Sequence, residues 1–430
     1  MIAIAATSDP RNQNADVGDR LPVVVIGAGA AGFMAALSAA HGPRPVVLLE
    51  GTEQPGRKIL ISGGGRCNVL PSAATPDDFV TDGSHHNLRK ILRAWPLPAV
   101  RRFFEEDLAL PLRLEPETGK LFPVANRARD VLDALLSAAD RAGVHLRTSA
   151  RVTGLEPGSP WRVLLASGEC LLAAAVVLAT GGLSVPATGS DGTGLRLVQT
   201  LGHSLVPPYP ALVPLTGDNP AHHALAGISL PVTLTAPAPP RAARDRERGL
   251  IQSRGGFLFT HRGYSGPAVL NIAHIAVRAT YVGGPRPPIW VQWGALDAEG
   301  WEAELRRGRG SILSLLRGHL PERLALQLLA ETGLAGVDLS QLSRENRGRL
   351  VEALAHYPLP WQGHEGYRTA EVTGGGVPLA EVYPATLASR VRPGLYLCGE
   401  ILDAFGPIGG YNFLWAWVTG RSAGLAAGAG

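Results

Sequence analysis

The chain has 430 residues, of which 45% are hydrophobic and 18% are charged, and its formal net charge is +4 at pH 7. This composition is sufficient for a large buried core and excludes a disordered or collagen-like protein. The small net charge is weak evidence for a polyanionic partner, and the longest unbroken apolar run, residues 171–179, is far shorter than the roughly 20 residues that span a bilayer.

Residues 1–20 lack the basic start and the apolar segment of a signal peptide, so we expect them to form a mobile extension. The three cysteines Cys67, Cys170 and Cys398 are far apart and form no C-x-x-C pair. A sparse, odd number of cysteines suits a reducing compartment. We therefore expect a cytoplasmic protein without a membrane segment.

The first periodic segment predicts a short β-α-β unit. Residues 21–26 form an apolar run of strand length, which leads into the glycine pattern Gly27-x-Gly29-x-x-Gly32 and an Ala-rich helix over residues 30–40. In such a unit the first glycine permits a tight turn, the second lets the backbone approach a pyrophosphate, and the third allows close helix–strand packing. The free N–H groups at the helix start then bind phosphate.

A second apolar run, residues 45–49, ends at Glu50. A carboxylate there accepts a hydrogen bond from a ribose 2′-hydroxyl, which favours FAD or NAD over NADP. Residues 56–68 add a glycine-rich loop, and Thr180-Gly181-Gly182 follows another predicted strand, whereas no second G-x-G-x-x-G follows a strand. One dinucleotide fold with extra glycine loops fits a tightly held, extended FAD, although residues 62–65 taken alone are also typical of a flexible surface loop.

The remaining elements suggest an insertion within a nucleotide-binding domain. A proline-rich change of texture near residue 205 precedes short strands, and helical patterns then occupy residues 301–357. The predicted strands are residues 144–152, 161–166, 171–180, 228–234, 256–260, 289–293, 370–377 and 394–399, and the other predicted helices are 129–142, 191–201 and 413–427.

Four blocks of sequence resemble a known family. They are GRKILISGGGRCN at 56–68, THRGYSGP at 260–267, TGGGV at 373–377 and GLYLCGEILDAFGPIGGYNFLWAWVTGRSAG at 394–424. In this order they resemble the bacterial BaiN/RdsA-type flavoproteins, a group of FAD-dependent oxidoreductases also described as aminoacetone oxidase family proteins. The resemblance extends from about residue 22 to residue 424.

The resemblance implies an α/β protein whose Rossmann-like FAD domain is built from both chain ends, residues 21–204 and 366–430. It also implies a β-rich, barrel-like insert at 205–300 and a helical insert at 301–365. The FAD-binding residues predicted from the motifs and from the resemblance are Gly27, Gly29, Ala30, Ala31, Gly32, Glu50, Arg57, Lys58, Ser62, Gly63, Gly64, Arg66, Cys67, Asn68, Val152, Thr180, Gly181, Gly182, Gly399, Glu400, Asp403, Gly409, Gly410, Tyr411 and Asn412.

The closing segment has a physical rationale within this assignment. Glu400 at a strand end can accept hydrogen bonds from the ribityl chain, and the segment from Gly409 to Asn412 leads into the last helix. The positive N-terminal end of that helix would stabilise the negative charge near N1 and O2 of reduced flavin.

Few catalytic side chains are expected, because flavin performs hydride transfer itself. Cys67 is a candidate proton donor, and its alternative is a small buried apolar residue. His261 is a candidate general acid, and its alternative is a turn histidine bonded to the backbone. Arg66 and Lys58 can offset cofactor charge, with a surface salt bridge as the alternative for Arg66.

Other polar residues receive simpler interpretations. Tyr264 and Ser265 can orient a substrate carbonyl, and Ser265 equally suits a helix cap. The pairs at 85–86 and 222–223 are histidines without nearby metal-ligand partners, so we expect surface residues and no metal site. The arginine-rich run 241–248 predicts a solvated loop or an RNA-backbone contact.

The sequence is compatible with three functions. The first is hydride transfer between flavin and a C=C bond of a small organic substrate, with NADH or NADPH or another donor reducing the flavin. The second is reduction of a uridine in ribosomal RNA, which the resemblance also implies. The third is a non-enzymatic, flavin-binding redox sensor.

Overall fold

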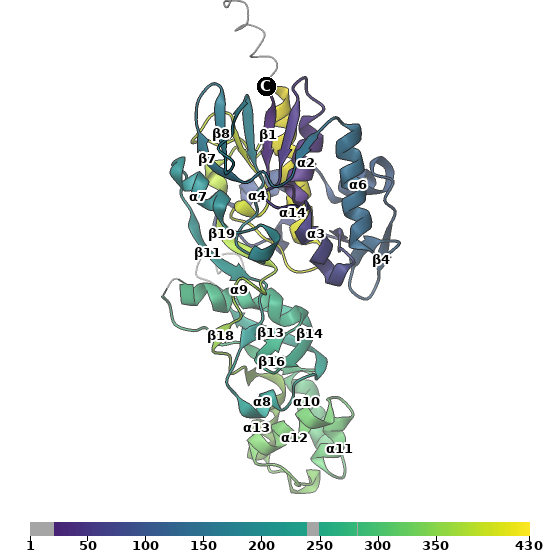
Figure 1. Ribbon diagram of the computed structural model, residues 1–430. Coiled ribbons are helices and arrows are strands. Elements are labelled where there is room, and N and C mark those ends of the chain that lie inside the picture. Colours follow the sequence, from purple (N-terminus) through teal and green to yellow (C-terminus); the bar gives the residue numbers. More distant parts are fainter. Residues whose placement is uncertain (1–20, 239–248, 282) are drawn as a thin grey trace, which may run out of the picture. The chain divides into compact units, whose positions relative to one another are not determined.

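The computed structural model describes residues 21–238, 249–281 and 283–430, and the expected extension 1–20 and the arginine-rich run 241–248 lie outside the described residues. The chain forms two compact units (Figure 1). Unit 1 combines the segment up to Pro208 with Val372–Gly430, and unit 2 is Tyr209–Glu371. The chain thus leaves the first unit after Pro208 and re-enters it at Val372.

Unit 1 is built around a five-stranded sheet with the order β20-β10-β1-β2-β6 and only parallel pairings. The strands are Leu395–Leu397 (β20), Ala175–Leu178 (β10), Val23–Ile26 (β1), Val46–Leu49 (β2) and His145–Arg147 (β6). β1 and β10 are buried along their whole length, as expected for strands covered on both faces. The helices α2 (Ala30–Ala39) and α14 (Tyr411–Ala429) lie side by side, so segments from the two ends of the sequence pack together in unit 1 (Figure 1).

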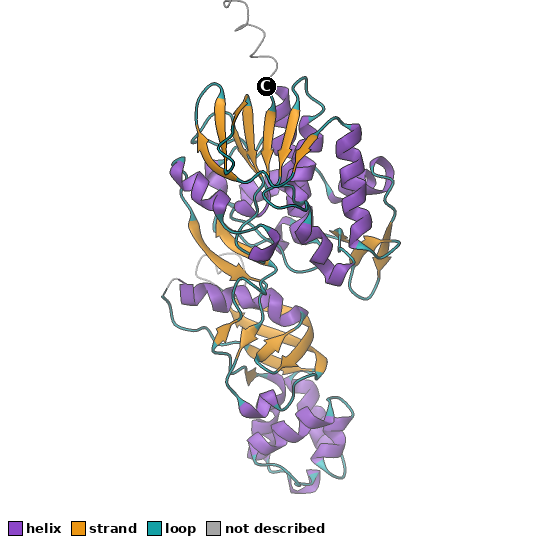
Figure 2. Ribbon diagram, in the orientation of Figure 1, coloured by secondary structure: helices purple, strands orange, loops and turns teal. Residues whose placement is uncertain are grey.

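Smaller elements surround this sheet (Figure 2). Two three-stranded antiparallel sheets have the orders β7-β8-β9 and β3-β5-β4, and β11 pairs with β19. Their bounds, with the remaining helices of unit 1, are β3 Leu70–Pro71, β4 Leu112–Glu115, β5 Lys120–Pro123, β7 Val152–Glu156, β8 Trp161–Leu165, β9 Cys170–Ala173, β11 Val206–Ala211, β19 Val372–Gly376, α3 Arg57–Ile61, α4 His85–Arg93, α5 Leu97–Arg102, α6 Ala128–Arg141 and α7 Thr193–Thr200; short helical turns are η1 Ser62–Gly65, η2 Pro76–Asp78, η3 Phe103–Asp107, η4 Pro186–Thr188, η7 Leu379–Glu381 and η8 Gly399–Ile401.

Two predicted strands are wrong as single elements. Residues 171–180 contain the end of β9 and all of β10, which belong to different sheets because the chain turns at Ala174, whose N–H donates to Pro22. Residues 144–152 contain β6 and only the start of β7. Between them Ser149 has a positive φ of 54°, and Ala150 donates its N–H to the Glu50 carbonyl.

Unit 2 contains a seven-stranded sheet with the order β17-β16-β13-β14-β15-β12-β18, in which neighbouring strands pair antiparallel. The helices α10–α13 follow β16 in the chain. The bounds are β12 Leu215–Thr216, β13 Ser229–Pro237, β14 Leu250–Thr260, β15 Gly263–Ser265, β16 Trp290–Trp293, β17 Tyr357–Pro358, β18 Gly363–His364, α8 Pro220–His223, α9 Pro267–Tyr281, α10 Ala298–Arg307, α11 Ile312–Arg317, α12 Glu322–Thr332, η6 Leu339–Gln341 and α13 Arg344–Ala355. Within the described ranges, no helix combines the length and apolarity that a bilayer crossing demands.

Candidate functional site: the open helix starts of unit 1

The turn between β1 and α2 has the geometry of a phosphate-binding loop. Gly27 has a φ of 102°, and a Cβ there would lie 2.6 Å from the Ala179 carbonyl oxygen. A Cβ on Gly32 would collide with the Gly27 carbonyl, whereas a Cβ on Gly29 would meet nothing within 4 Å. No side chain of the described residues caps α2, so the first N–H groups of the helix have no side-chain acceptor, as at a helix start that binds an anion.

Glu50 follows β2 beside this turn and is only 9% exposed. Its Oε2 accepts the Ala28 N–H at 3.1 Å, and its Oε1 accepts the N–H and the hydroxyl of Thr52, both at 2.8 Å. A carboxylate oxygen has about two acceptor positions, so Oε2 keeps room for a further donor such as a ribose hydroxyl. The carboxylate is oriented by its own chain before any ligand binds.

The second glycine loop reverses the chain after α3. Gly63, Gly64 and Gly65 have φ values of 56°, 68° and 85°, and a Cβ on Gly64 would meet nothing within 4 Å. The loop therefore exposes backbone to an approaching ligand. Among the described residues the buried Oδ1 of Asn68 has no hydrogen-bond partner.

The two polar candidates of this loop differ in exposure. Cys67 is fully buried in the apolar core, and burial raises the pKa of its thiol to about 12. A side chain without accessible surface has no face to offer a substrate, which favours the packing role. The Arg66 guanidinium is 3.1 Å from the Glu115 carboxylate and stacks 4.2 Å from the Phe122 ring centre.

Three glycines bring α14 against α2. A Cβ on Gly420 or Gly424 would collide with the carbonyl of Ala31 or Ala35, and a Cβ on Gly428 would lie 2.5 Å from the Ala39 carbonyl. These pairs advance together along both helices, so the helices are parallel and their N-termini point the same way. Tyr411, the first residue of α14, precedes Gly420 by nine residues, whereas Ala30, the first residue of α2, precedes Ala31 by one. The start of α14 therefore lies eight residues beyond the start of α2, which is about 12 Å at 1.5 Å per residue.

The start of α14 likewise lacks a side-chain cap among the described residues. Gly409 and Gly410 have positive φ values of 114° and 93°. The Asn412 amide binds backbone instead, because its Oδ1 accepts the Gly406 N–H at 2.9 Å and its Nδ2 donates to Gly406 at 2.9 Å. Tyr411, the first helical residue, is partly buried and packs edge-on against Phe79.

The other predicted positions lie around these loops. Thr180 lies two residues after β10, and its buried Oγ1 has no partner within the described part of the chain. Gly181 has a φ of 71°, and a Cβ on Gly182 would collide with Thr373. Val152 is buried at the start of β7. Arg57 is the first residue of α3. The Oδ2 of Asp403 accepts hydrogen bonds from the Thr81 hydroxyl and the Asp82 N–H, so this oxygen binds the segment around Thr81.

Glu400 joins a network that the sequence did not indicate. Its carboxylate binds Lys58, Ser184 and Thr373 rather than being left open. Ser184 and Thr373 were missed because neither belongs to a nucleotide motif, although Thr373 opens the TGGGV block. The glycines that follow Thr373 were the sequence feature that could have indicated its place in the site.

Unit 2 holds His261, in a two-residue turn between β14 and β15, where its side chain is exposed. Its proposed proton transfer stays a prediction. The expectation that His222 lies on the surface is wrong: it is 2% exposed and bonds to the Tyr264 hydroxyl at 2.8 Å and the Tyr357 hydroxyl at 3.0 Å. Tyr264 is likewise buried, so its hydroxyl serves this cluster and not a substrate carbonyl.

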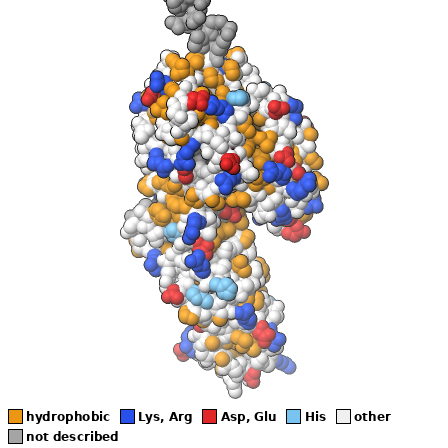
Figure 3. All heavy atoms as spheres, viewed as in Figure 1, with side chains coloured by type: hydrophobic (Ala, Val, Ile, Leu, Met, Phe, Trp, Pro, Cys, Tyr) orange, Lys and Arg blue, Asp and Glu red, His pale blue; other side chains and the backbone are white. Residues whose placement is uncertain are grey.

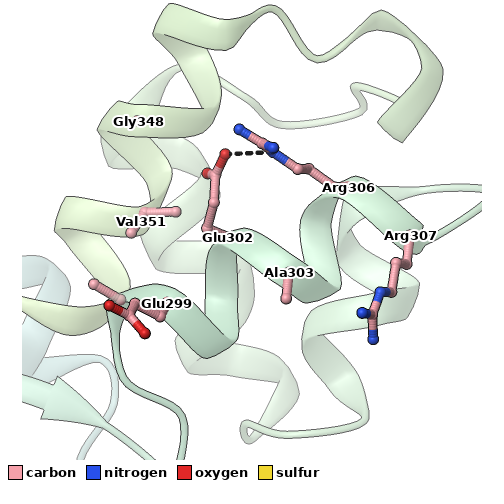
Figure 4. A pocket seen from close by; sticks show the side chains of 8 residues that line it. Glu299, Glu302, Ala303, Arg306, Arg307, Gly348 and Val351 are labelled. Atoms are coloured by element: carbon pink, nitrogen blue, oxygen red, sulfur yellow. Dashed lines mark hydrogen bonds and ion pairs between the residues drawn. The ribbon is translucent and has the colours of Figure 1, made fainter.

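Unit 2 also has a cavity of about 590 Å³ beside α10 and α13 (Figure 4). Two of its charged residues are paired with each other, since Glu302 accepts a hydrogen bond from Arg306 at 2.7 Å, and Glu302 also accepts one from Arg347 at 3.0 Å. We assign no chemistry to this cavity.

An extended dinucleotide fits the residues of unit 1. Two parallel helix starts without side-chain caps, about 12 Å apart along their axes, suit the anionic diphosphate at one end and a ring system that gains negative charge at the other. Thr180 Oγ1 and Asn68 Oδ1 are buried polar atoms that lack partners within the described chain. A ligand with hydroxyl and ring N–H groups can satisfy such atoms.

The fold and this site define a Rossmann-type, FAD-dependent oxidoreductase. Residues 21–426 match the family described as HI0933-like protein Rossmann domain, and the chain belongs to that family. This confirms the family resemblance drawn from the four sequence blocks, and it leaves the non-enzymatic sensor without support.

Two named relatives cover nearly the whole chain. A protein of Escherichia coli named ribosomal RNA dihydrouridine synthase is 33% identical over 404 residues, with 93% of this chain and 96% of the relative covered. A protein of Clostridium scindens named 3-dehydro-bile acid delta(4,6)-reductase is 32% identical over 415 residues, with 94% and 98% covered. The 3-ketosteroid-delta4-(5alpha)-dehydrogenase structure from Rhodococcus jostii shares the fold at 14% identity, with a TM-score of 0.50 and coverage of 96% and 97%.

Proposed function

We propose that the protein transfers hydride between FAD and a C=C bond conjugated to a carbonyl group of an organic substrate, and that NADH or NADPH reduces the flavin in the cytoplasm. The observation that carries this proposal is the parallel pair of helix starts, on α2 and α14, that no described side chain caps. The names of the two relatives support the substrate class: one reduces a 3-dehydro bile acid, and dihydrouridine is uridine whose conjugated C5=C6 bond has been saturated.

Bound FAD supplies the hydride chemistry. The chain binds and orients it: the N–H groups at the start of α2 bind the diphosphate, and Glu50 accepts a ribose hydroxyl. The N–H groups at the start of α14 stabilise negative charge on the reduced ring. His261 is the residue that donates a proton to the substrate, because its side chain is exposed and imidazole is the most common general acid in enzymes.

An anaerobic titration tests the proposal. Purified protein should be yellow, its flavin absorbance should bleach with NADH or NADPH, and it should return when a 3-oxo-Δ4 steroid is added. Protein that binds no FAD on reconstitution would contradict the proposal. Reduced flavin that reacts with neither a steroid nor a uridine-containing RNA would contradict the substrate class.

A uridine of ribosomal RNA is the second candidate substrate, favoured by the 33% identity over 93% of the chain to the Escherichia coli relative. On the face drawn in Figure 3, basic and acidic side chains are interspersed, so that face presents no broad basic surface. Mass spectrometry of ribosomal RNA from a deletion strain decides this point. Loss of one dihydrouridine, restored by the wild-type gene, supports the RNA substrate, and an unchanged dihydrouridine content eliminates it.

A further inference from the structure

Four side chains from four segments of unit 1 form one hydrogen-bonded network. Glu400 Oε1 accepts from Ser184 Oγ at 2.6 Å, from the Thr373 N–H at 3.0 Å and from Thr373 Oγ1 at 2.8 Å. Glu400 Oε2 accepts from Lys58 Nζ at 2.7 Å, and Lys58 also donates to Ser184 Oγ. The carboxylate thus receives four hydrogen bonds, about as many as its two oxygens can accept.

The network lies beside the nucleotide turn. The N–H of Gly56, two residues before Lys58, donates to the Ala28 carbonyl at 2.8 Å. On the other side, a Cβ on Gly399, the residue before Glu400, would lie 2.8 Å from the Ala31 Cβ. The Lys58–Glu400 ion pair therefore joins two segments that both contact the start of α2.

The two partners of this ion pair differ in what they can offer a ligand. The Lys58 side chain is 28% exposed, and its ammonium has three donors, of which two have partners among the described residues. The Glu400 side chain is 17% exposed; its Oε1 receives three hydrogen bonds, and the one donor that the described residues give its Oε2 is the Lys58 ammonium. The charges also favour Lys58 as the ligand-binding partner, because a diphosphate attracts an ammonium and repels a carboxylate.

We propose that Lys58 binds the diphosphate of the cofactor, and that Glu400 is a positioning residue that holds the lysine and does not bind the ribityl chain. This inference rests on FAD as the cofactor of the proposed function, and it replaces our sequence-based role for Glu400. Hydrogen bonds from Ser184 and Thr373 orient the Glu400 carboxylate, and the ion pair with this carboxylate holds the Lys58 ammonium in position.

The assignment predicts unequal effects of removing the two charges. Lys58→Met removes a charged donor and leaves a lone, partly buried carboxylate beside the diphosphate, so binding should weaken strongly. Glu400→Gln loses the ion pair that positions the ammonium, but it keeps an oxygen that accepts a hydrogen bond and removes a like charge from the site, so binding should weaken less than in Lys58→Met. In Lys58→Met/Glu400→Gln the stranded carboxylate is gone, so binding should be tighter than in Lys58→Met alone.

The experiment measures dissociation constants of FAD, ADP and riboflavin for the apoprotein by fluorescence titration. Lys58→Met should weaken FAD and ADP about tenfold or more and leave riboflavin, which has no phosphate, within about twofold. Lys58→Arg should restore most of the affinity for ADP. Lys90→Met, a change at an exposed lysine of α4, is the matched control and should have no effect.

Three outcomes would overturn the assignment. Equal weakening of ADP and riboflavin by Lys58→Met would show a merely structural network. Weakening of riboflavin by Glu400→Gln, with ADP unaffected, would return Glu400 to the ribityl chain. Normal ADP binding by Lys58→Met would remove the lysine from the diphosphate. Wild-type apoprotein that binds neither FAD nor ADP would instead refute the proposed function on which the inference depends.

Discussion

The end of β2 and the segment after β20 each carry a glutamate near the same parallel sheet, yet the two carboxylates have different surroundings. Glu50 is bound by backbone N–H groups and one hydroxyl, and one of its oxygens has a single donor. Glu400 is bound by an ammonium, two hydroxyls and an N–H group. Within the described chain, each carboxylate therefore has one oxygen with a single donor, but that donor is an uncharged backbone N–H at Glu50 and an ammonium from a distant segment at Glu400.

The largest effect is expected from Glu50→Arg. The change removes the ribose acceptor, releases the Ala28 N–H and introduces a bulky cation, so we expect FAD affinity to fall about 100-fold or more. FAD content after gel filtration measures the loss. Glu53→Arg, at an exposed position three residues away, is the control, and equal FAD content in the two variants would separate Glu50 from the cofactor.

The second prediction concerns a residue outside the cofactor unit. His261→Ala should leave FAD content and flavin reduction by NADH or NADPH unchanged, and should slow flavin reoxidation by the substrate about 100-fold because a general acid is lost. Stopped-flow absorbance separates the two half-reactions. The control is His356→Ala, a change at another exposed histidine of unit 2, in which the flavin should be reoxidised at the wild-type rate. Reoxidation at the wild-type rate in His261→Ala would show that His261 is only a turn residue.

A third change tests the register between the two helix starts. In Gly424→Leu the new side chain collides with the Ala35 carbonyl, so α14 must move away from α2. We expect the free energy of unfolding to fall by about 1–3 kcal/mol and FAD affinity to fall about tenfold. Leu425→Ala, an adjacent residue with a 38% exposed side chain, should change neither, and a stable Gly424→Leu protein with normal affinity would contradict the shared site.

The smallest effect is a pH dependence of stability in unit 2. Burial lowers the pKa of His222, partly opposed by Glu331. Below about pH 6.5 the unfolded histidine binds a proton that the folded one resists, so stability should fall as the pH is lowered, by at most about 1.4 kcal/mol per pH unit. Urea unfolding at about pH 7 and about pH 5.5 should show a shallower loss in His222→Gln than in wild type, and identical slopes would contradict the assignment.

Local patterns sufficed for the β-α-β unit that we propose binds the cofactor. The glycine turn, the helix from Ala30 and the strand before Glu50 follow from spacing within a short stretch of chain. The packing of α14 on α2 could be expected only through the family resemblance, because Gly420 and Ala31 are far apart in sequence.

The errors have one physical origin. The break at Ala174 and the burial of His222 depend on partners that no local pattern identifies, such as Pro22 for the former and Tyr357 for the latter. The same limitation hid the network of Glu400, whose partners lie in three other segments. Local sequence predicts where a polar side chain sits along its element and not what it meets across the fold.

The flavin content of the purified chain tests the central claim most directly, because both helix starts must hold one molecule. Absorbance spectra after reconstitution should give about one FAD per wild-type chain, and Glu50→Arg at the start of α2 and Gly424→Leu at the contact of α14 should each reduce that content. Wild-type protein that stays colourless, or variants that retain full flavin content at both positions, would contradict the shared FAD site.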